Sequence, residues 1–285
     1  MFVCVKNHLM DDSWLRRSWE ATPTSPAETL VIAFAGFDGR LGGAGGSRDG
    51  DRHKEAAKHD GLPPHEFVHA CERAGATHAI FCRDLYQAWY LRGTPQNPRG
   101  GWNAVLEALE AEMEALKPGR LITLGASMGG YAAIRAGLAL GADVAVAFSP
   151  QVLVDSSQRE AAELPRMPFD DGLKVLKRSL WVEGHSMTSL VDVVREQSAS
   201  GKCRRDQGAT ATAIEVHVGS NESGDVREAR LLKDAVTALG SPGPVSITVV
   251  DHNGMDHNVV TSLRNQGALD AILRRLLGTG AKDSG

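Results

Sequence analysis

Six short apolar segments recur along the chain and constrain its fold more than any other feature. They cover residues 30–35, 78–82, 120–124, 144–148, 213–218 and 245–250. Each segment is largely apolar and is bounded by turn residues, which is typical of strands buried on both faces of a sheet. Strands of this kind occur in parallel sheets that helices cover on both sides.

Stretches with helical periodicity lie between most of these segments. They cover residues 63–75, 102–116, 131–140, 226–239 and 268–277. The stretch 63–75 carries proline in its first turn and ends at Gly75, and the stretch 102–116 places its apolar residues on one stripe. Alternating strands and helices require crossover connections. We therefore expect an α/β fold with a mostly parallel central sheet flanked by helices.

Residues 150–207 interrupt this alternation. They contain Pro165, Pro168 and mixed polar and helical sequence, without a convincing strand. We interpret them as a small, mostly helical cap inserted over one end of the sheet, with residues 173–180 and Trp181 as candidates to cover the site. A chain of 285 residues then suits a single α/β domain, 1–285, with one insertion.

Composition argues against several classes of function. Hydrophobic residues make up 42% and charged residues 23%, and the formal net charge of −4 offers no basic excess for nucleic acid. No apolar segment approaches the roughly twenty residues that span a bilayer, and residues 1–12 lack the apolar core of a signal peptide. We therefore expect a cytoplasmic protein. Its four cysteines form no C-x-x-C pair and are expected to be free thiols: Cys4, Cys71, Cys82 and Cys203.

The turn after the segment 120–124 carries the most specific motif of the chain. It reads Gly-Ala-Ser-Met-Gly-Gly over residues 125–130, with the serine at position 127, and leads into the helical stretch 131–140. A serine on such a sharp turn projects its hydroxyl above the sheet, and side chains in place of the flanking glycines would collide with the turn. The helix directs its N-terminal amides at developing negative charge. The motif indicates that Ser127 is a nucleophile.

These residues resemble those of the α/β-hydrolase superfamily. The resemblance rests on Ser127-Met-Gly-Gly-Tyr131 followed by Ala147-Phe-Ser-Pro-Gln151, and it extends over about residues 30–277. The chain is most similar to serine hydrolases of uncertain substrate that bacterial genomes encode. The resemblance implies the catalytic order serine, acid, histidine, with the acid after the next-to-last strand and the histidine after the last. We expect no cofactor and no metal.

Two histidines, His252 and His257, lie in the loop after the last expected strand, 245–250. A serine hydroxyl is a poor nucleophile at neutral pH without an adjacent imidazole. The resemblance implies that His257 is this base, since it follows a glycine-bearing loop and opens the final helical stretch. His252, next to the strand end, is the weaker candidate.

The triad acid is expected after the segment 213–218, where Glu222 and Asp225 are both available. Asp225 stands before a helical stretch, a place that also suits an N-cap residue. The resemblance implies an acid at this place. We take Asp225 as the triad acid, Glu222 as its alternative, and Asp155 after the preceding strand as a remote one.

Two backbone amides are needed to stabilise an oxyanion. The resemblance implies the amide of Met128, next to the nucleophile, and a second amide from the loop after the segment 30–35, where Phe37 is the best candidate. The H-G-G-G form of some esterases is absent. The glycine-rich segment 42–46 lacks the spacing of a phosphate-binding loop, so we interpret it as a rim of the site within the irregular stretch 36–61.

A zinc-protease signature competes with this interpretation. His65-Glu66-Phe-Val-His69 matches H-E-x-x-H, which on a helix places two histidines on one face. Glu72 and Gly75 stand where the extended motif requires glycine and histidine, so a third ligand is not evident. We interpret the match as a coincidental surface face of a helix that packs between two strands.

The expected function is hydrolysis of a small-molecule carboxylic ester or thioester through an acyl-enzyme. An acyltransferase or a peptidase uses the same triad, and a catalytically silent binding or scaffold protein and the zinc peptidase are further alternatives. The natural substrate, the acyl-chain length and the oligomeric state are open at this point. One cluster after the segment 78–82 could serve either core packing or substrate contact: Arg83, Asp84, Tyr86, Trp89 and Tyr90.

Overall fold

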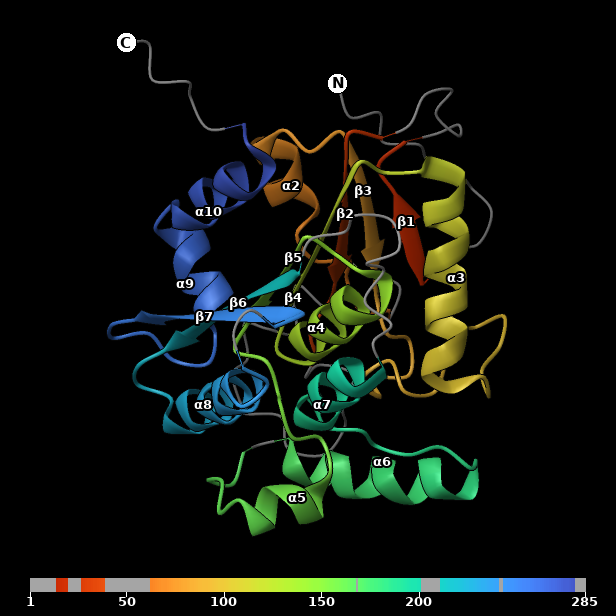
Figure 1. Cartoon of the computed structure of the whole chain (residues 1–285), viewed down its shortest axis with the longest axis vertical. Helices are drawn as coiled ribbons and strands as arrows, with labels where there is room; N and C mark the ends of the chain where they lie inside the picture. Colours follow the sequence, from red (N-terminus) through yellow and green to blue (C-terminus); the bar gives the residue numbers. More distant parts are fainter. Residues whose placement is uncertain are drawn as a thin grey trace.

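A seven-stranded sheet with the order β1-β3-β2-β4-β5-β6-β7 forms the centre of the computed structural model (Figure 1). The structure describes residues 14–19, 27–38, 62–167, 169–200, 211–240 and 243–279. Neighbouring strands are parallel except β1, which pairs antiparallel with β3. The strands are β1 (Leu15–Arg17), β2 (Thr29–Phe34), β3 (His78–Cys82), β4 (Arg120–Ala126), β5 (Val144–Phe148), β6 (Thr212–Gly219) and β7 (Val245–His252).

All six strands expected from the sequence are present, and their ends lie within two residues of the expected positions. The sequence analysis missed β1. Its three residues include two arginines and pair only with β3 at the edge of the sheet, so no apolar run marks it. Parallel strands buried on both faces are recognisable from sequence, whereas a short polar edge strand is not.

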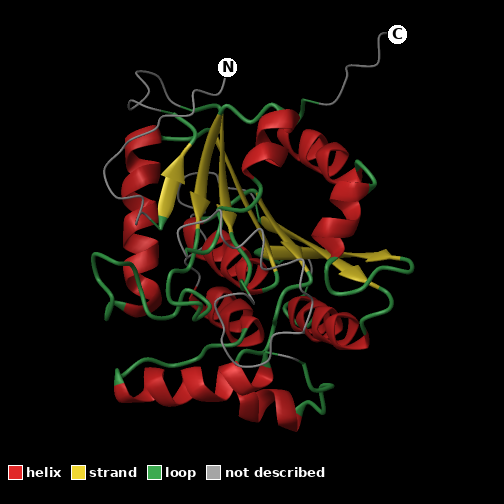
Figure 2. Cartoon of the chain, turned by 180° about the vertical axis from the view of Figure 1, so that it is seen from behind, coloured by secondary structure: helices red, strands yellow, loops and turns green. Residues whose placement is uncertain are grey.

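Helices cover both faces of the sheet (Figure 2). The strand residues divide between two cores: Leu30, Ile32 and Phe34 of β2 belong to one, and Val31 and Ala33 to the other. The first core lies beneath α3 (Gly101–Leu116), α4 (Met128–Leu140) and α8 (Ser223–Thr237), and the second beneath α2 (Val68–Ala74), α9 (Val259–Asn265) and α10 (Ala268–Leu277).

The helix expected at 63–75 begins five residues later in the structure than the sequence predicts. The observed helix, α2, covers only Val68–Ala74. Phe67 has a φ of 64°, in the left-handed region, and a helix does not continue through such a residue. Pro64 also disfavours a helical conformation for the residue before it. The expectation was wrong for residues 63–67, which form an irregular segment.

Residues 150–200 contain three helices, α5 (Ser156–Ala161), α6 (Asp170–Val182) and α7 (Leu190–Ser200). Figure 1 shows α5 and α6 on the side of the sheet toward which β2 and β3 point, whereas α7 packs against α4 and α8. The side chain of Trp181 on α6 is 82% exposed. Pro168 and residues 201–207 of the expected insertion lie outside the described residues.

A buried ion pair joins this region to the domain. Glu228 of α8 accepts hydrogen bonds from the backbone N–H groups of Val152 and Leu153 and pairs with Arg159 of α5. Glu228 and Arg159 are both almost completely buried. Burial raises the pKa of the Glu228 carboxyl, although Arg159 and the two amides act in the opposite direction.

We expect Glu228→Ala to lower the free energy of unfolding by about 3 kcal/mol, because it leaves Arg159 without a buried counter-charge and two amides without an acceptor. Arg159 also pairs with Asp170 (2.8 Å), which keeps the loss near the lower end of the usual range. Urea unfolding followed by circular dichroism measures it. Asp171→Ala, which breaks the exposed Arg166 pair, is the control and should cost less than about 1 kcal/mol. An equally small loss of stability for Glu228→Ala would contradict the interpretation that this ion pair holds residues 150–200 to the domain.

The strand order, the antiparallel edge strand and the serine turn between β4 and α4 identify the α/β-hydrolase fold, so the expected fold class is confirmed. Within the described residues no helix combines the length and apolar character needed to cross a bilayer. Cys71 and Cys82 are buried free thiols, and burial raises the pKa of Cys71 to about 12. Cys4, Cys203 and the glycine-rich segment 42–46 lie outside the described residues.

Candidate active site

Ser127 occupies the turn between β4 and α4 with a φ of 52° and a ψ of −118°, a conformation that residues other than glycine avoid. The glycines around it are explained by close backbone contacts. A Cβ on Gly125 would collide with the carbonyl of Gly129, and a Cβ on Gly129 would collide with the carbonyls of Phe34 and Ala35. The turn therefore needs glycine on both sides of the serine, and the packing around it holds the strained backbone.

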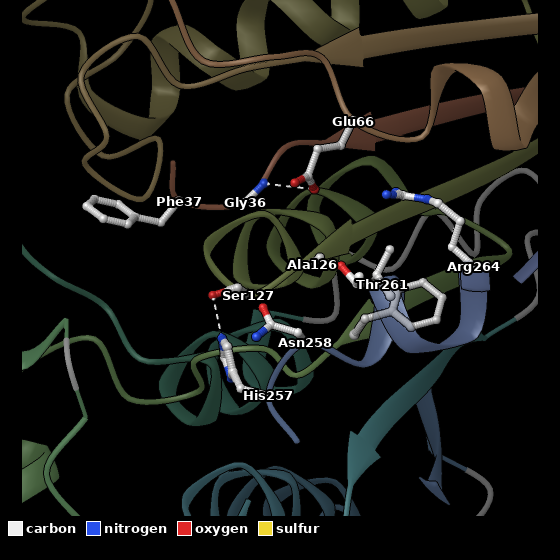
Figure 3. Close-up of a pocket in the computed structure, with 11 residues that line it drawn as sticks. Gly36, Phe37, Glu66, Ala126, Ser127, His257, Asn258, Thr261 and Arg264 are labelled. Atoms are coloured by element: carbon white, nitrogen blue, oxygen red, sulfur yellow. Dashed lines mark hydrogen bonds between the residues drawn. The ribbon is translucent and has the colours of Figure 1, made fainter. Parts of the chain in front are cut away.

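The side chains of Ser127, His257 and Asp225 form one continuous series of hydrogen bonds. His257 Nε2 lies 3.0 Å from Ser127 Oγ (Figure 3), and His257 Nδ1 lies 2.8 Å from Asp225 Oδ2. A carboxylate only accepts hydrogen bonds, so Nδ1 carries the proton and Nε2 is free to accept one from the serine. The three residues named from the sequence meet in the geometry of nucleophile, base and orienting acid.

The parallel sheet brings these three side chains to one edge. Ser127 follows β4, Asp225 lies in the first turn of α8 after β6, and His257 lies in the loop between β7 and α9. A Cβ on Gly219, at the end of β6, would collide with the carbonyls of Met255 and its neighbour. The glycine lets the loop that carries His257 pack directly against the end of β6.

The charge of Asp225 tunes the imidazole of His257. Burial by itself would lower the pKa of His257, but the hydrogen bond and the charge of Asp225 outweigh it and raise the pKa above its ordinary value of 6.5. The raised pKa means that the site stabilises an imidazolium at this position. A base that must hold the serine proton during a reaction needs this property.

The two amides expected to form an oxyanion hole come from the start of α4 and from the loop after β2. Met128 is the first residue of α4, where backbone N–H groups have no acceptor within the helix. In the segment 35–38, the backbone N–H of Ala35 donates to the carbonyl of Cys82. The N–H of Gly36 donates to the side chain of Glu66, and the N–H of Asp38 donates to the side chain of Gln87. Within the described residues the amide of Phe37 is the one in this segment that has no acceptor.

Gln151 also contacts Ser127, a role that the sequence analysis did not assign. Its Nε2 lies 2.8 Å from Ser127 Oγ, and its Oε1 accepts a hydrogen bond from Trp89 Nε1 at 3.1 Å. Gln151 is 1% exposed. It ends the motif Ala147-Phe-Ser-Pro-Gln151, three residues after the wholly apolar strand β5, and a polar side chain this close to a strand end was the signal that could have identified it.

The alternative residues from the sequence have other partners. Glu222 is the N-cap of α8, the position that the sequence suggested for Asp225. His252 Nε2 lies 2.8 Å from His217 Nδ1, and within the described residues no hydrogen bond joins it to Ser127. Asp155 caps α5 and pairs with a lysine of α6.

The residues of the H-E-x-x-H match do not share a helix face, because α2 begins only after His65 and Glu66. Burial, with the charge of Arg83, lowers the pKa of His65 to about 3, so its ring is neutral. His69 is exposed on α2 and contacts Glu72. In the part of the chain that the structure describes, no three His, Cys, Asp or Glu side chains converge as metal ligands.

A cavity of about 160 Å³ opens beside Ser127 and His257 (Figure 3). Figure 3 shows the carboxylate of Glu66 and the guanidinium of Arg264 at the end away from His257. Glu66 accepts the N–H of Gly36 at 3.2 Å, and burial raises the pKa of its carboxyl. The cavity thus extends from the hydroxyl of Ser127 to a strongly polar end.

A series of aromatic contacts leads from Phe37, which lines the cavity, to His257. The ring of Trp89 stacks on Phe37 with centroids 6.0 Å apart and meets Phe169 at 6.1 Å, and Phe169 lies 6.5 Å from His257. The buried carboxylate of Asp84 holds the loop of Trp89 by accepting three backbone N–H groups. Phe169 comes from the segment before α6, and the sequence analysis did not identify it.

Comparison with known proteins supports the fold. No family model matches the chain, and no curated protein is similar enough to match. Among solved structures, the Glycosylation Associate Protein (Gap123) complex from Streptococcus agalactiae aligns over 95% of this chain at 16% identity with a TM-score of 0.54. The chain spans only 45% of that protein's chain.

Two smaller proteins align over most of both chains. The capsule O-acetyltransferase of Neisseria meningitidis serogroup A is 12% identical, with 90% of this chain and 92% of that chain covered and a TM-score of 0.54. An S-formylglutathione hydrolase from Agrobacterium tumefaciens is 14% identical, with 88% and 83% covered, and its TM-score of 0.48 is too low to support an argument. At these identities the similarity establishes the fold alone.

Proposed function

We propose that the chain is a serine hydrolase that cleaves a carboxylic ester or thioester through an acyl-enzyme. The series of hydrogen bonds from Asp225 through His257 to Ser127 Oγ is the observation that carries this proposal. It joins a serine on a strained turn to a histidine in the loop after β7 and to a carboxylate in the first turn of α8, which supports the roles of nucleophile, base and orienting acid.

In the acylation half, His257 Nε2 takes the hydroxyl proton as Ser127 Oγ attacks the substrate carbonyl. The carbonyl electron pair moves to its oxygen, which the amides of Met128 and Phe37 stabilise. His257 then gives the proton to the leaving alcohol or thiol. In deacylation, water repeats these steps, and Asp225 keeps the ring oriented throughout.

The cavity beside Ser127 favours a short acyl group. Its volume of about 160 Å³ is roughly that of a cavity that holds one benzene molecule. A longer alkyl chain would reach the carboxyl of Glu66 and the guanidinium of Arg264 and would remove water from these polar groups without replacing its hydrogen bonds. Arg264 lines the cavity, and its charge acts on the carboxyl of Glu66.

We therefore expect kcat/KM for p-nitrophenyl esters to fall by at least about tenfold between butyrate and octanoate. In an apolar acyl pocket each added CH₂ would instead contribute about 0.8 kcal/mol, a rise of roughly fourfold. Arg264→Leu should raise the octanoate-to-acetate ratio while leaving acetate turnover near that of the wild type. A steady rise of kcat/KM through octanoate in the wild type would contradict this acyl limit.

Helices α5 and α6 are proposed to act as a cap for the site. Phe169, directly before α6, supports this because its ring lies 6.5 Å from His257 and meets Trp89. Glu228 and Arg159 fasten the same region to α8. The cap would then contribute an aromatic side chain to the leaving-group side, while Trp181 faces solvent.

Acyl transfer to an alcohol is the second candidate function. The meningococcal capsule O-acetyltransferase shares the fold, and an acyl-enzyme passes its acyl group to an alcohol by the same steps as to water. Adding glycerol or a simple sugar to an ester assay separates the two functions. Hydrolysis alone keeps acid release equal to alcohol release, whereas transfer makes acid release fall behind.

Labelling by a fluorophosphonate probe tests the proposed function most directly. We expect stoichiometric modification of Ser127, located by peptide mass spectrometry, because the probe reacts with activated serines. A chelator should leave labelling and ester turnover unchanged, whereas it would inactivate a zinc peptidase by removing its metal. Absence of labelling in a folded protein would favour the catalytically silent fold.

A further inference from the structure

The orientation of the Gln151 carboxamide is determined by its neighbours. The indole of Trp89 is a hydrogen-bond donor only, and its Nε1 lies 3.1 Å from one end of the carboxamide. That end must be the oxygen, so the NH₂ group faces Ser127 Oγ at 2.8 Å. Trp89 and Gln151 are both buried, at 2% and 1% exposed, so water offers neither group a substitute partner.

This orientation decides where the serine proton points. Because Gln151 donates to Ser127 Oγ, the hydroxyl must direct its own proton elsewhere. His257 Nε2 accepts it at 3.0 Å, since His257 Nδ1 carries the proton that Asp225 accepts. Every hydrogen bond from Trp89 through Gln151, Ser127 and His257 to Asp225 therefore runs in one direction.

We propose that Gln151 is a catalytic residue that acts on the nucleophile itself, an inference that rests on the proposed serine-hydrolase function. It orients the Ser127 hydroxyl toward His257 before attack. As the proton leaves for His257 and the bond from Oγ to the acyl carbon forms, the Gln151 N–H stabilises the negative charge that develops on Oγ. Gln151 gives up no proton, so the proton balance of the reaction is unchanged.

If Gln151 had only a structural role, the expected order of its two variants would differ from the order that a catalytic role predicts. Gln151→Glu keeps the shape and keeps an acceptor for Trp89, but it replaces the donor at Ser127 with an acceptor. Gln151→Leu keeps only the approximate volume. If Gln151 merely filled space and held Trp89, the glutamate variant would be the milder change.

We expect the opposite order. The carboxylate of Gln151→Glu would accept the serine proton that His257 needs and would repel charge on Oγ. Its rate constant for fluorophosphonate labelling should fall by at least about a hundredfold, and that of Gln151→Leu by about tenfold. Thr123→Val is the matched control: it removes a buried hydrogen bond from β4 to the Ala133 carbonyl and should lower Tm while labelling at the wild-type rate.

A second measurement tests the contact without any activity. In ¹H–¹⁵N NMR spectra, Ser127→Ala should move one Gln151 side-chain amide proton upfield and leave the Trp89 indole proton in place. Unchanged Gln151 resonances would overturn the proposal, as would wild-type labelling by Gln151→Glu or a slower rate for Gln151→Leu than for Gln151→Glu. If the wild-type protein is not labelled but Ser127→Ala still shifts the Gln151 amide proton, the hydrolase function is rejected and the contact between Gln151 and Ser127 is retained.

Discussion

Ser127→Ala should reduce p-nitrophenyl acetate turnover to below about a hundredth of the wild-type value while the protein stays folded. The substitution removes only the hydroxyl, and alanine occupies the turn with the same Cβ that serine has. The loss should therefore appear in kcat and in fluorophosphonate labelling, with Tm close to that of the wild type.

Ser149→Ala is the matched control for this variant. Ser149 is also a buried serine with a positive φ, of 45°, and it lies at the end of the neighbouring strand β5. Within the described residues its hydroxyl has no hydrogen-bond partner. We expect near wild-type turnover. Activity retained by Ser127→Ala would remove this serine from the mechanism, whatever the control shows.

His257→Ala should lose as much activity as Ser127→Ala, because the two side chains act as one unit and their effects do not add. Asp225→Asn should keep small but measurable activity, about 10²- to 10⁴-fold below the wild type, since the acid only orients the ring and stabilises its charge. Steady-state kinetics with p-nitrophenyl acetate measures both. Glu222→Gln and His252→Ala are the controls and should stay near the wild type, because neither side chain contacts Ser127.

The pH profile carries an additional test of Asp225. Only neutral His257 can accept the serine proton, so kcat/KM should rise with pH as the imidazole loses its charge. Asp225 raises the pKa of His257 above 6.5, which places the midpoint of this rise above that pH. Asp225→Asn removes the raising charge, so the midpoint should move to lower pH. If Glu222→Gln lost most of its activity while Asp225→Asn kept wild-type activity, Glu222 rather than Asp225 would be the triad acid.

The strands and the serine turn were predictable from the sequence, because both depend on local requirements. A strand buried on both faces must be apolar almost throughout, as β2 and β5 are, and such runs are visible without a structure. The turn at Ser127 tolerates only glycine at positions 125 and 129, so its motif is visible in the same way. The short edge strand β1 obeys neither requirement and was missed.

Which polar groups meet depends on how the chain packs in three dimensions. Asp225 and Glu222 are three residues apart, and the sequence favoured Asp225 only through a family resemblance. The first turn of α8 directs Asp225 to His257, while Glu222 caps the helix. Gln151 and Trp89 come from different strand ends, and only the packed sheet places both at Ser127. A hydrogen bond requires an approach within about 3 Å, which depends on how distant segments pack rather than on any local pattern.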